Sequence, residues 1–224
     1  MTFIKNTTID SAKKKRLPAA KRRKQLLDAA LKVFSWRGYD AATMDDIAEE
    51  AGVTKPLLYQ HFKSKRALYL ELINDISLGI IGQVTAATTT AQTPRLRVEL
   101  GFRAYFSYVI QHENAFRLLF GRGAPHDKEL TLAVRKVEMK MAETLAPLIE
   151  IDISPEHRKL LAHGVIGIAE ASSRYWLSFA SQETPTNTSI ESANNLAKHV
   201  ADLTWSGLRG IQPDQADYKE VSIK

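Results

Sequence analysis

The chain has 224 residues, 44% of them hydrophobic, enough for one large domain or two smaller ones with a packed core. It contains no cysteine, which excludes disulfides, a thiol nucleophile and a thiolate metal site. The N-terminus lacks an apolar signal segment, and no uninterrupted run of about 18 apolar residues occurs. We therefore expect a cytoplasmic protein that has no membrane partner.

The net charge of +6 is concentrated at the N-terminus. Residues 1–24 hold nine Lys or Arg and one Asp, a charge of +8, so the other 200 residues sum to −2. A clustered basic end suits a polyanionic partner, which it binds by releasing counterions. We expect residues 1–20 to be a disordered basic arm, for which DNA contact and plain solvation remain equal alternatives.

The first predicted helix begins near Pro18 or Lys21 and ends at Gly38. Its apolar stripe consists of Leu26, Leu27, Ala30, Leu31 and Phe34. A second, short helix follows. Thr43 and Asp46 have capping-box spacing at its start, and Gly52 suits its end because glycine adopts positive φ without steric cost.

A third helix is predicted from Lys55 to about His61. Leu58 and Phe62 lie four residues apart and face inward, which leaves the other side polar. Gln60 is suited to reading adenine in the major groove, while Lys and Tyr side chains suit phosphates. The two short helices and their turn predict a helix-turn-helix with the second helix as the reader.

The segment from Arg22 to about Ile73, RRKQLLDAALKVFSWRGYDAATMDDIAEEAGVTKPLLYQHFKSKRALYLELI, resembles the DNA-binding domain of TetR-family transcriptional repressors. The resemblance implies that residues 21–66 bind a double-stranded DNA operator. It implies phosphate contacts from Thr43, Thr54, Tyr59, His61 and Lys65, and base-facing positions at Lys55, Pro56, Leu57 and Gln60.

The rest of the chain is also predicted to be helical. One long helix is capped by Ser64, with a break at Gly82 and the polar run 85–93. A further helix is expected to start at Thr93 and Pro94 and to carry Phe102, Tyr105, Phe106 and Val109 on one face. Others are expected near residues 114–120, 128–149 and 155–181, and a last one to about 208 begins at a capping box of Thr188 and Glu191. No period-two strand pattern is visible. The fold class is therefore all-α, with an N-terminal three-helix helix-turn-helix domain, a larger helical domain over residues 67–210 and a flexible tail over 211–224.

The last two long helices carry more apolar surface than a monomer covers easily. TetR-like proteins pair these helices in a four-helix homodimer interface, which would place two readers on a palindromic operator. By this resemblance the candidate dimerisation residues are Val165, Ile168, Trp176, Leu196, Val200, Leu203 and Trp205. Packing within one copy is the alternative for part of this set.

Aromatic residues of the second domain are candidates for an effector pocket, although an aromatic stripe at helical spacing also suits plain core. The candidate ligand-binding residues are Phe102, Tyr105, Phe106, Phe116, Phe120, Met139, Glu170, Arg174 and Tyr175. Glu170 and Arg174 lie four apart, so they either form a helix ion pair or orient a polar ligand group.

The pieces AGVTKPLLYQHFKSKRALYLELI, FRLLF and GVIGIAEASSRYWL resemble actinobacterial TetR-type regulators of fatty-acid synthesis. This resemblance implies a small hydrophobic effector, a long-chain acyl-CoA, in an apolar tunnel. Some regulators of that group activate transcription, so activation stays open beside repression. We expect a homodimeric, effector-responsive regulator without metal or cofactor.

Three rival functions remain. An enzyme is disfavoured because the six His are scattered without metal-ligand spacing, and no catalytic residue stands out. A sequence-nonspecific DNA-binding protein would not need the second domain. A TetR-type regulator of drug efflux would sense a cationic or aromatic compound, and pocket carboxylates such as Glu170 would then matter.

Overall fold

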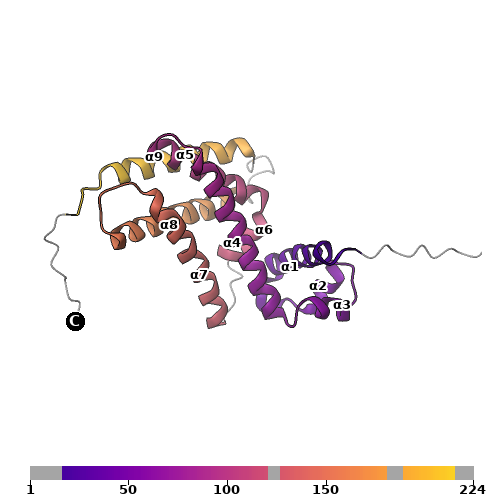
Figure 1. The fold of residues 1–224 in the computed structure, drawn as a ribbon. Coiled ribbons are helices and arrows are strands. Elements are labelled where there is room, and N and C mark those ends of the chain that lie inside the picture. Colours follow the sequence, from indigo (N-terminus) through magenta and orange to yellow (C-terminus); the bar gives the residue numbers. More distant parts are fainter. Residues whose placement is uncertain (1–16, 121–126, 181–188, 215–224) are drawn as a thin grey trace, which may run out of the picture.

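The computed structural model describes residues 17–120, 127–180 and 189–214 (Figure 1). Within these ranges all regular secondary structure is helical and no strand occurs, which confirms the all-α prediction. The expected N-terminal arm lies almost wholly outside the described residues, as do most of the tail and Thr188. Figure 1 shows three helices at one end and a larger helical body at the other, joined by α4.

The head consists of α1 (Ala19–Ala41), α2 (Met44–Glu50) and α3 (Lys55–His61). Its core is formed by Leu26 and Phe34 of α1, Ile47 of α2 and Leu58 of α3, all buried. Gly38 interrupts the regular geometry of α1 with a φ of 77°, which confirms that the helix proper ends there.

Helix α4 (Lys65–Thr89) begins with the predicted cap, since the Ala67 N–H donates to Ser64 Oγ at 3.1 Å. The predicted break at Gly82 is wrong, because α4 continues to Thr89. A glycine inside a helix costs only about 1 kcal/mol, and burial of Ile80 and Val84 on either side outweighs it. By length and composition alone α4 could cross a membrane, but much of its apolar surface packs inside this protein.

The larger body adds α5 (Pro94–Gln111), α6 (Glu113–Phe120), α7 (Lys128–Leu145), the 3₁₀ turn η1 (Ala146–Leu148), α8 (Pro155–Ala180) and α9 (Ile190–Arg209). Helix α5 packs between α4 and α9, while α7 packs against both α4 and α8. Helix α6 lies on α1, so the head touches the body at a second place (Figure 1).

The last helix begins one residue later than predicted. Ser189 is its N-cap and forms a capping box with Ser192, whose amide donates to Ser189 Oγ at 3.1 Å. Serine accepts the amide as well as threonine does, so sequence spacing did not distinguish this box from the expected one at Thr188 and Glu191.

Three aromatic rings fasten the head to α4. Tyr69 of α4 is fully buried and packs edge-on against Phe34, with 5.4 Å between ring centroids, and against Tyr39, with 4.7 Å. Burial raises the pKa of Tyr69 to about 12, so its hydroxyl stays neutral at physiological pH. These contacts fix the direction in which α4 leaves the head.

Further along, α4 approaches α5 closely at Gly79. A Cβ built there would lie 2.7 Å from the hydroxyl oxygen of Tyr108 and 3.1 Å from a ring carbon of the same residue. Tyr108 is buried, and its hydroxyl lies 3.4 Å from the Ile76 carbonyl. A Cβ at position 79 would therefore displace the buried Tyr108 ring.

We predict that Gly79→Ala destabilises the protein by about 1–3 kcal/mol, because overpacking displaces the Tyr108 ring and outweighs the gain in helix propensity. Gly82→Ala is the matched control on the same helix, since nothing lies within 4 Å of its built Cβ. It should stabilise the protein by up to about 1 kcal/mol. Urea unfolding measures both; equal effects of the two variants would contradict the close approach.

Candidate nucleic-acid interface and effector cavity

The turn between α2 and α3 is fixed by caps at both ends of α2. The Asp46 N–H donates to Thr43 Oγ1 at 3.1 Å, and the Thr43 N–H donates to Asp46 Oδ2 at 2.9 Å, which confirms the capping box. The Thr43 hydroxyl lowers the pKa of Asp46. Gly52 has a φ of 61° as expected, and Gln25 Nε2 of α1 donates to the Ala51 carbonyl at 2.7 Å.

Helix α3 presents a polar face to solvent. Leu58 and Phe62 are buried beneath it, while Tyr59 is 43% exposed. The other candidates on α3 and at its N-cap are exposed at Thr54, Lys55, Pro56 and Gln60 and half-buried at Leu57 and His61. Helical spacing puts Lys55, Pro56, Tyr59 and Gln60 on the side away from the core, with Leu57 and His61 beside them.

Two lysines among the DNA-facing candidates also have partners within the head. The Lys55 ammonium donates to Asp45 Oδ2 of α2 at 2.8 Å, and this hydrogen bond raises the pKa of Lys55. The Lys65 ammonium donates to the carbonyls of Tyr39 and Ala42, both at 2.8 Å, and lies 4.5 Å above the centre of the Tyr39 ring. Lys65 thus stabilises the junction of α1 and α4 as well as lying beside α3.

Arg23 positions the reader helix, a role that the sequence pattern did not predict. Its Nε donates to Glu71 of α4 at 2.6 Å, and its Nη1 donates to the His61 carbonyl at the end of α3 at 3.2 Å. The guanidinium also lies 4.5 Å from the centre of the Phe62 ring. One side chain therefore connects α1, the end of α3 and α4.

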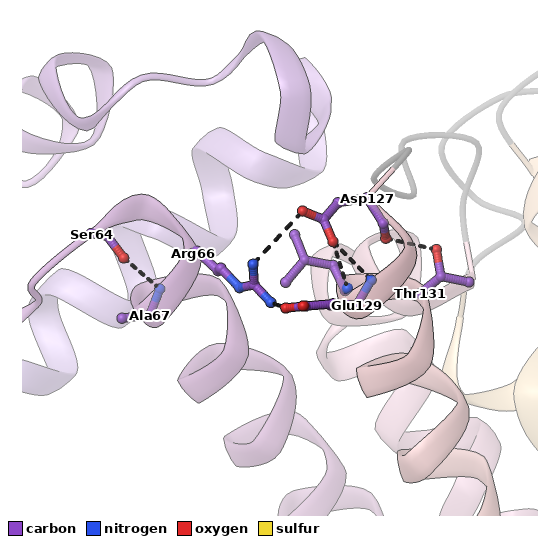
Figure 2. A network of polar contacts seen from close by, with 7 residues as sticks. Ser64, Arg66, Ala67, Asp127, Glu129 and Thr131 are labelled. Carbon is purple, nitrogen blue, oxygen red and sulfur yellow. Dashed lines mark hydrogen bonds and ion pairs between the residues drawn. The ribbon is translucent and has the colours of Figure 1, made fainter.

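A second arginine connects the start of α4 to the body. Figure 2 shows Arg66 extending to the first turn of α7, where it pairs with Asp127 and Glu129. Asp127 is also the N-cap of α7, because its Oδ1 accepts from the amides of Glu129 at 2.8 Å and Leu130 at 3.2 Å. A shift of α7 would therefore act directly on the first turn of α4.

The body contains a cavity of about 240 Å³ between α4, α5, α7, α8 and α9. Its walls are largely apolar, and the residues that define its faces include Ile80, Val84, Val98, Phe102, Tyr105, Met141, Leu145, Val165, Ile166, Ala169, Trp205 and Leu208. Burial raises the pKa of Tyr105 above its ordinary value, with the nearby Ser173 hydroxyl opposing the shift. The cavity suits an apolar small molecule.

Two of the predicted ligand-binding residues, Phe102 and Tyr105, line this cavity. Phe106 and Phe116 are buried in the core without lining it, while Met139 and Tyr175 are 48% and 67% exposed. Glu170 and Arg174 form the helix ion pair, the simpler of the two interpretations. The Phe120 side chain lies outside the part of the chain that the structure describes. Periodicity identified apolar positions but did not distinguish core, cavity and surface.

Two arginines that no sequence motif marked also line the cavity. Arg97 of α5 donates to Glu150 Oε1 at 2.7 Å, and Arg209 belongs to the last turn of α9. The helical spacing of Pro94, Arg97, Gly101 and Tyr105 puts them on one face of α5, so the same periodicity that marked Tyr105 could have identified Arg97.

The predicted dimerisation residues fall into four environments. Leu203 is 65% exposed, whereas Val200 is buried in the core. Val165 and Trp205 line the cavity, and Ile168, Trp176 and Leu196 are half-buried against the core. The outer side of α8 instead exposes Leu160, Tyr175 and the small residues Gly164, Gly167 and Ala171 between them.

The comparisons with known proteins agree with this architecture. Residues 26–72 match the model of the bacterial regulatory proteins of the tetR family. The chain is 37% identical to the HTH-type transcriptional activator FasR of Mycolicibacterium smegmatis over 198 residues, 88% of this chain and 87% of that one.

Solved structures are similar as well. A TetR-like regulator from Rhodococcus sp. RHA1 is 28% identical with a TM-score of 0.69, covering 88% of this chain and all of that one. FadR of Bacillus subtilis, solved with stearoyl-CoA, has a TM-score of 0.68 over 84% of this chain and 99% of its own; at 18% identity this likeness concerns the fold alone. The chain belongs to the TetR family of bacterial transcriptional regulators.

Proposed function

We propose that this TetR-family regulator controls genes of lipid metabolism and leaves its operator when a long-chain acyl-CoA occupies the cavity. The observation that carries the proposal is the cavity itself, which has apolar walls and contains Arg97 and Arg209. An acyl chain suits the walls, and arginines suit the phosphates of CoA. The 37% identity to FasR and the fold shared with a FadR bound to stearoyl-CoA support the lipid assignment.

The charges of the cavity favour this effector over a cationic drug. Glu150 is the one carboxylate among the described lining residues, and it pairs with Arg97. Glu170, which an efflux regulator would need in the pocket, pairs with Arg174 and does not line the described cavity. A cation would meet two arginines there, whereas an anionic head group is attracted to them.

DNA binding is assigned to residues 21–66, and effector binding and dimerisation to residues 67–210. Within the head, α3 lies in the major groove. Lys55, Pro56, Leu57 and Gln60 face the base edges, while Thr43, Thr54, Tyr59 and His61 contact the backbone. Lys65 serves both functions, because its ammonium holds the end of α1 next to the phosphates.

The protein acts as a homodimer in the cytoplasm. The outer side of α8 and the exposed Leu203 of α9 form the contact, since Gly164, Gly167 and Ala171 permit close helix approach between Leu160 and Tyr175. Two-fold symmetry then presents two copies of α3 to a palindromic operator. Sedimentation equilibrium, which separates a 25.1 kDa monomer from its dimer, tests this assembly.

The mechanism requires the effector to prefer one spacing of the two heads, because equal binding to both spacings shifts no population. The cavity is lined by α4 and α7, which the Arg66 contacts connect at the head. Filling the cavity moves these helices, and α4 changes the spacing of the two readers. Release of DNA then represses or activates transcription according to where the operator lies relative to the promoter.

For operator recognition, we predict that Tyr59→Phe weakens binding about fivefold for all operator variants, because one hydroxyl–phosphate hydrogen bond is lost. Gln60→Ala should cost about 1–3 kcal/mol and relax preference at one base pair in each half-site. The measurement is a gel shift with duplexes selected from a random pool, in excess random competitor. Gln111→Ala, an exposed glutamine outside the head, is the control. A uniform effect of Gln60→Ala across variants would exclude base reading.

For the effector, palmitoyl-CoA should release the selected operator, and Arg209→Ala should weaken its binding about three- to tenfold through loss of a charge-assisted contact. The weakening should diminish at high salt, where that contact is screened. Arg103→Ala is the matched control, an exposed arginine of α5 that does not line the described cavity. Calorimetry measures the affinities. Equal losses in the two variants would refute the assignment of Arg209 to the CoA phosphates.

For the coupling, we predict that Arg66→Ala binds palmitoyl-CoA as the wild type does but releases DNA less completely. The ratio of operator affinities without and with ligand should fall about fivefold, because α4 loses its link to Asp127 and Glu129. The control is Arg117→Ala, whose similarly exposed guanidinium pairs within its own helix. An unchanged ratio in Arg66→Ala would rule out this link as the route.

A further inference from the structure

The cavity has an outer and an inner end, and its lining residues show which is which. They lie in the last part of α4, α7 and α9 and in the first part of α5 and α8. Among the described lining residues, those exposed to solvent are Thr85, Pro94, Glu150 and Arg209. All four lie at or beside these helix ends, so the mouth of the cavity is on this side.

Polar contacts between the elements agree with this position of the mouth. Arg95 in the first turn of α5 donates to Asp202, near the end of α9, at 2.9 Å. Arg97 of α5 donates to Glu150, which follows α7 and η1, at 2.7 Å. The start of α5 is thus held to the ends of α9 and of the α7–η1 segment where the lining residues reach solvent.

At the inner end, four helices contribute lining residues that are buried. Those furthest from the mouth are Ile80 of α4, Tyr105 of α5, Met141 of α7 and Ala169 of α8. From Pro94 to Tyr105 the lining residues cover about 16 Å of α5. One turn beyond Tyr105, Tyr108 meets Gly79 in the close approach that brings α5 against α4. Within the described part of the chain, the cavity therefore ends at this level.

The Tyr105 side chain connects two walls at this inner end. Burial raises the pKa of Tyr105, and the nearby hydroxyl of Ser173, on α8 one turn beyond Ala169, opposes the shift. The ring therefore reaches from α5 toward α8. Phe106 is fully buried and packs edge-on against the Tyr105 ring, with 5.3 Å between the ring centroids. Because the interior is close-packed, this contact leaves the Tyr105 ring little room to swing aside.

We infer that Tyr105 closes the inner end of the cavity and sets the longest acyl chain that the site accepts. The inference rests on the proposed function, because it assigns a length limit to the same effector. With its head group at Arg97 and Arg209 near the mouth, an acyl chain extends along α5 toward the Tyr105 ring. Each methylene that enters the cavity favours binding, whereas a chain that is too long overpacks against the ring or leaves methylenes in water.

The experiment measures the Kd of saturated acyl-CoAs by calorimetry, from lauroyl-CoA through myristoyl-, palmitoyl- and stearoyl-CoA to arachidoyl-CoA. In the wild type each added pair of methylenes should tighten binding about tenfold until the chain reaches Tyr105, and the next member should gain nothing. Tyr105→Leu removes the ring but keeps the position apolar. It should move this break in the series to a longer chain by at least one member.

Two variants are matched controls. Tyr105→Phe keeps the ring and should keep the break, which separates the ring from its hydroxyl. Phe116→Leu removes a buried aromatic ring that does not line the described cavity, and it should also keep the break. Thermal unfolding without ligand checks the fold of each variant. If Tyr105→Leu does not fold, Tyr105→Trp tests the same limit in the other direction, because the larger ring should move the break to a shorter chain.

The outcomes separate the length limit from the effector assignment. An unmoved break in a folded Tyr105→Leu, or a wild-type affinity that rises through the whole series, would overturn the role of Tyr105 and leave acyl-CoA as the effector. Equal shifts in Tyr105→Leu and Phe116→Leu would also overturn it, because general loosening of the core would then set the limit. Failure of the wild type to bind any member would overturn the acyl-CoA assignment and the length limit with it.

Discussion

The structure depends on the packing of Tyr69 between Phe34 and Tyr39, which attaches the first turns of α4 to the reading head. The Lys65 ammonium strengthens the same junction by donating to the last carbonyls of α1 and lying over the Tyr39 ring. Because the junction is aromatic, buried and tightly packed, α4 cannot bend freely where it leaves the head. The junction therefore resists a change in the angle between α4 and the head.

The far end of α4 is one wall of the cavity, so a single helix belongs to both functional regions. Helix α7 is another wall, and its first turn returns to the head through Asp127 and Arg66. The two helices therefore reach the head at separate points, while α6 contacts α1 at a third. In the mechanism proposed above, these contacts make the head move with the body as one unit.

Local signals in the sequence were sufficient to predict the structure of the head. The capping box at Thr43, the positive φ of Gly52 and the inward Leu58 follow from short-range chemistry, and the structure confirms each. The residue roles in the body were harder to predict, because periodicity marks which residues are apolar but not what they contact. Trp205 and Val165 were assigned to a dimer interface and line the cavity, while Met139 was assigned to the pocket and is exposed.

The shortness of α3 limits how much sequence one head can specify. Seven residues of helix span about 10 Å, the length of roughly three base pairs. A given sequence of three base pairs recurs by chance about once in 64 positions. A given sequence of six base pairs, read by two heads, recurs about once in 4,000 positions. A genome offers on the order of a million or more competing sites. In the proposed dimer, further specificity must therefore come from the distance between the two heads and from DNA shape, so the spacing of the heads would itself contribute to operator recognition.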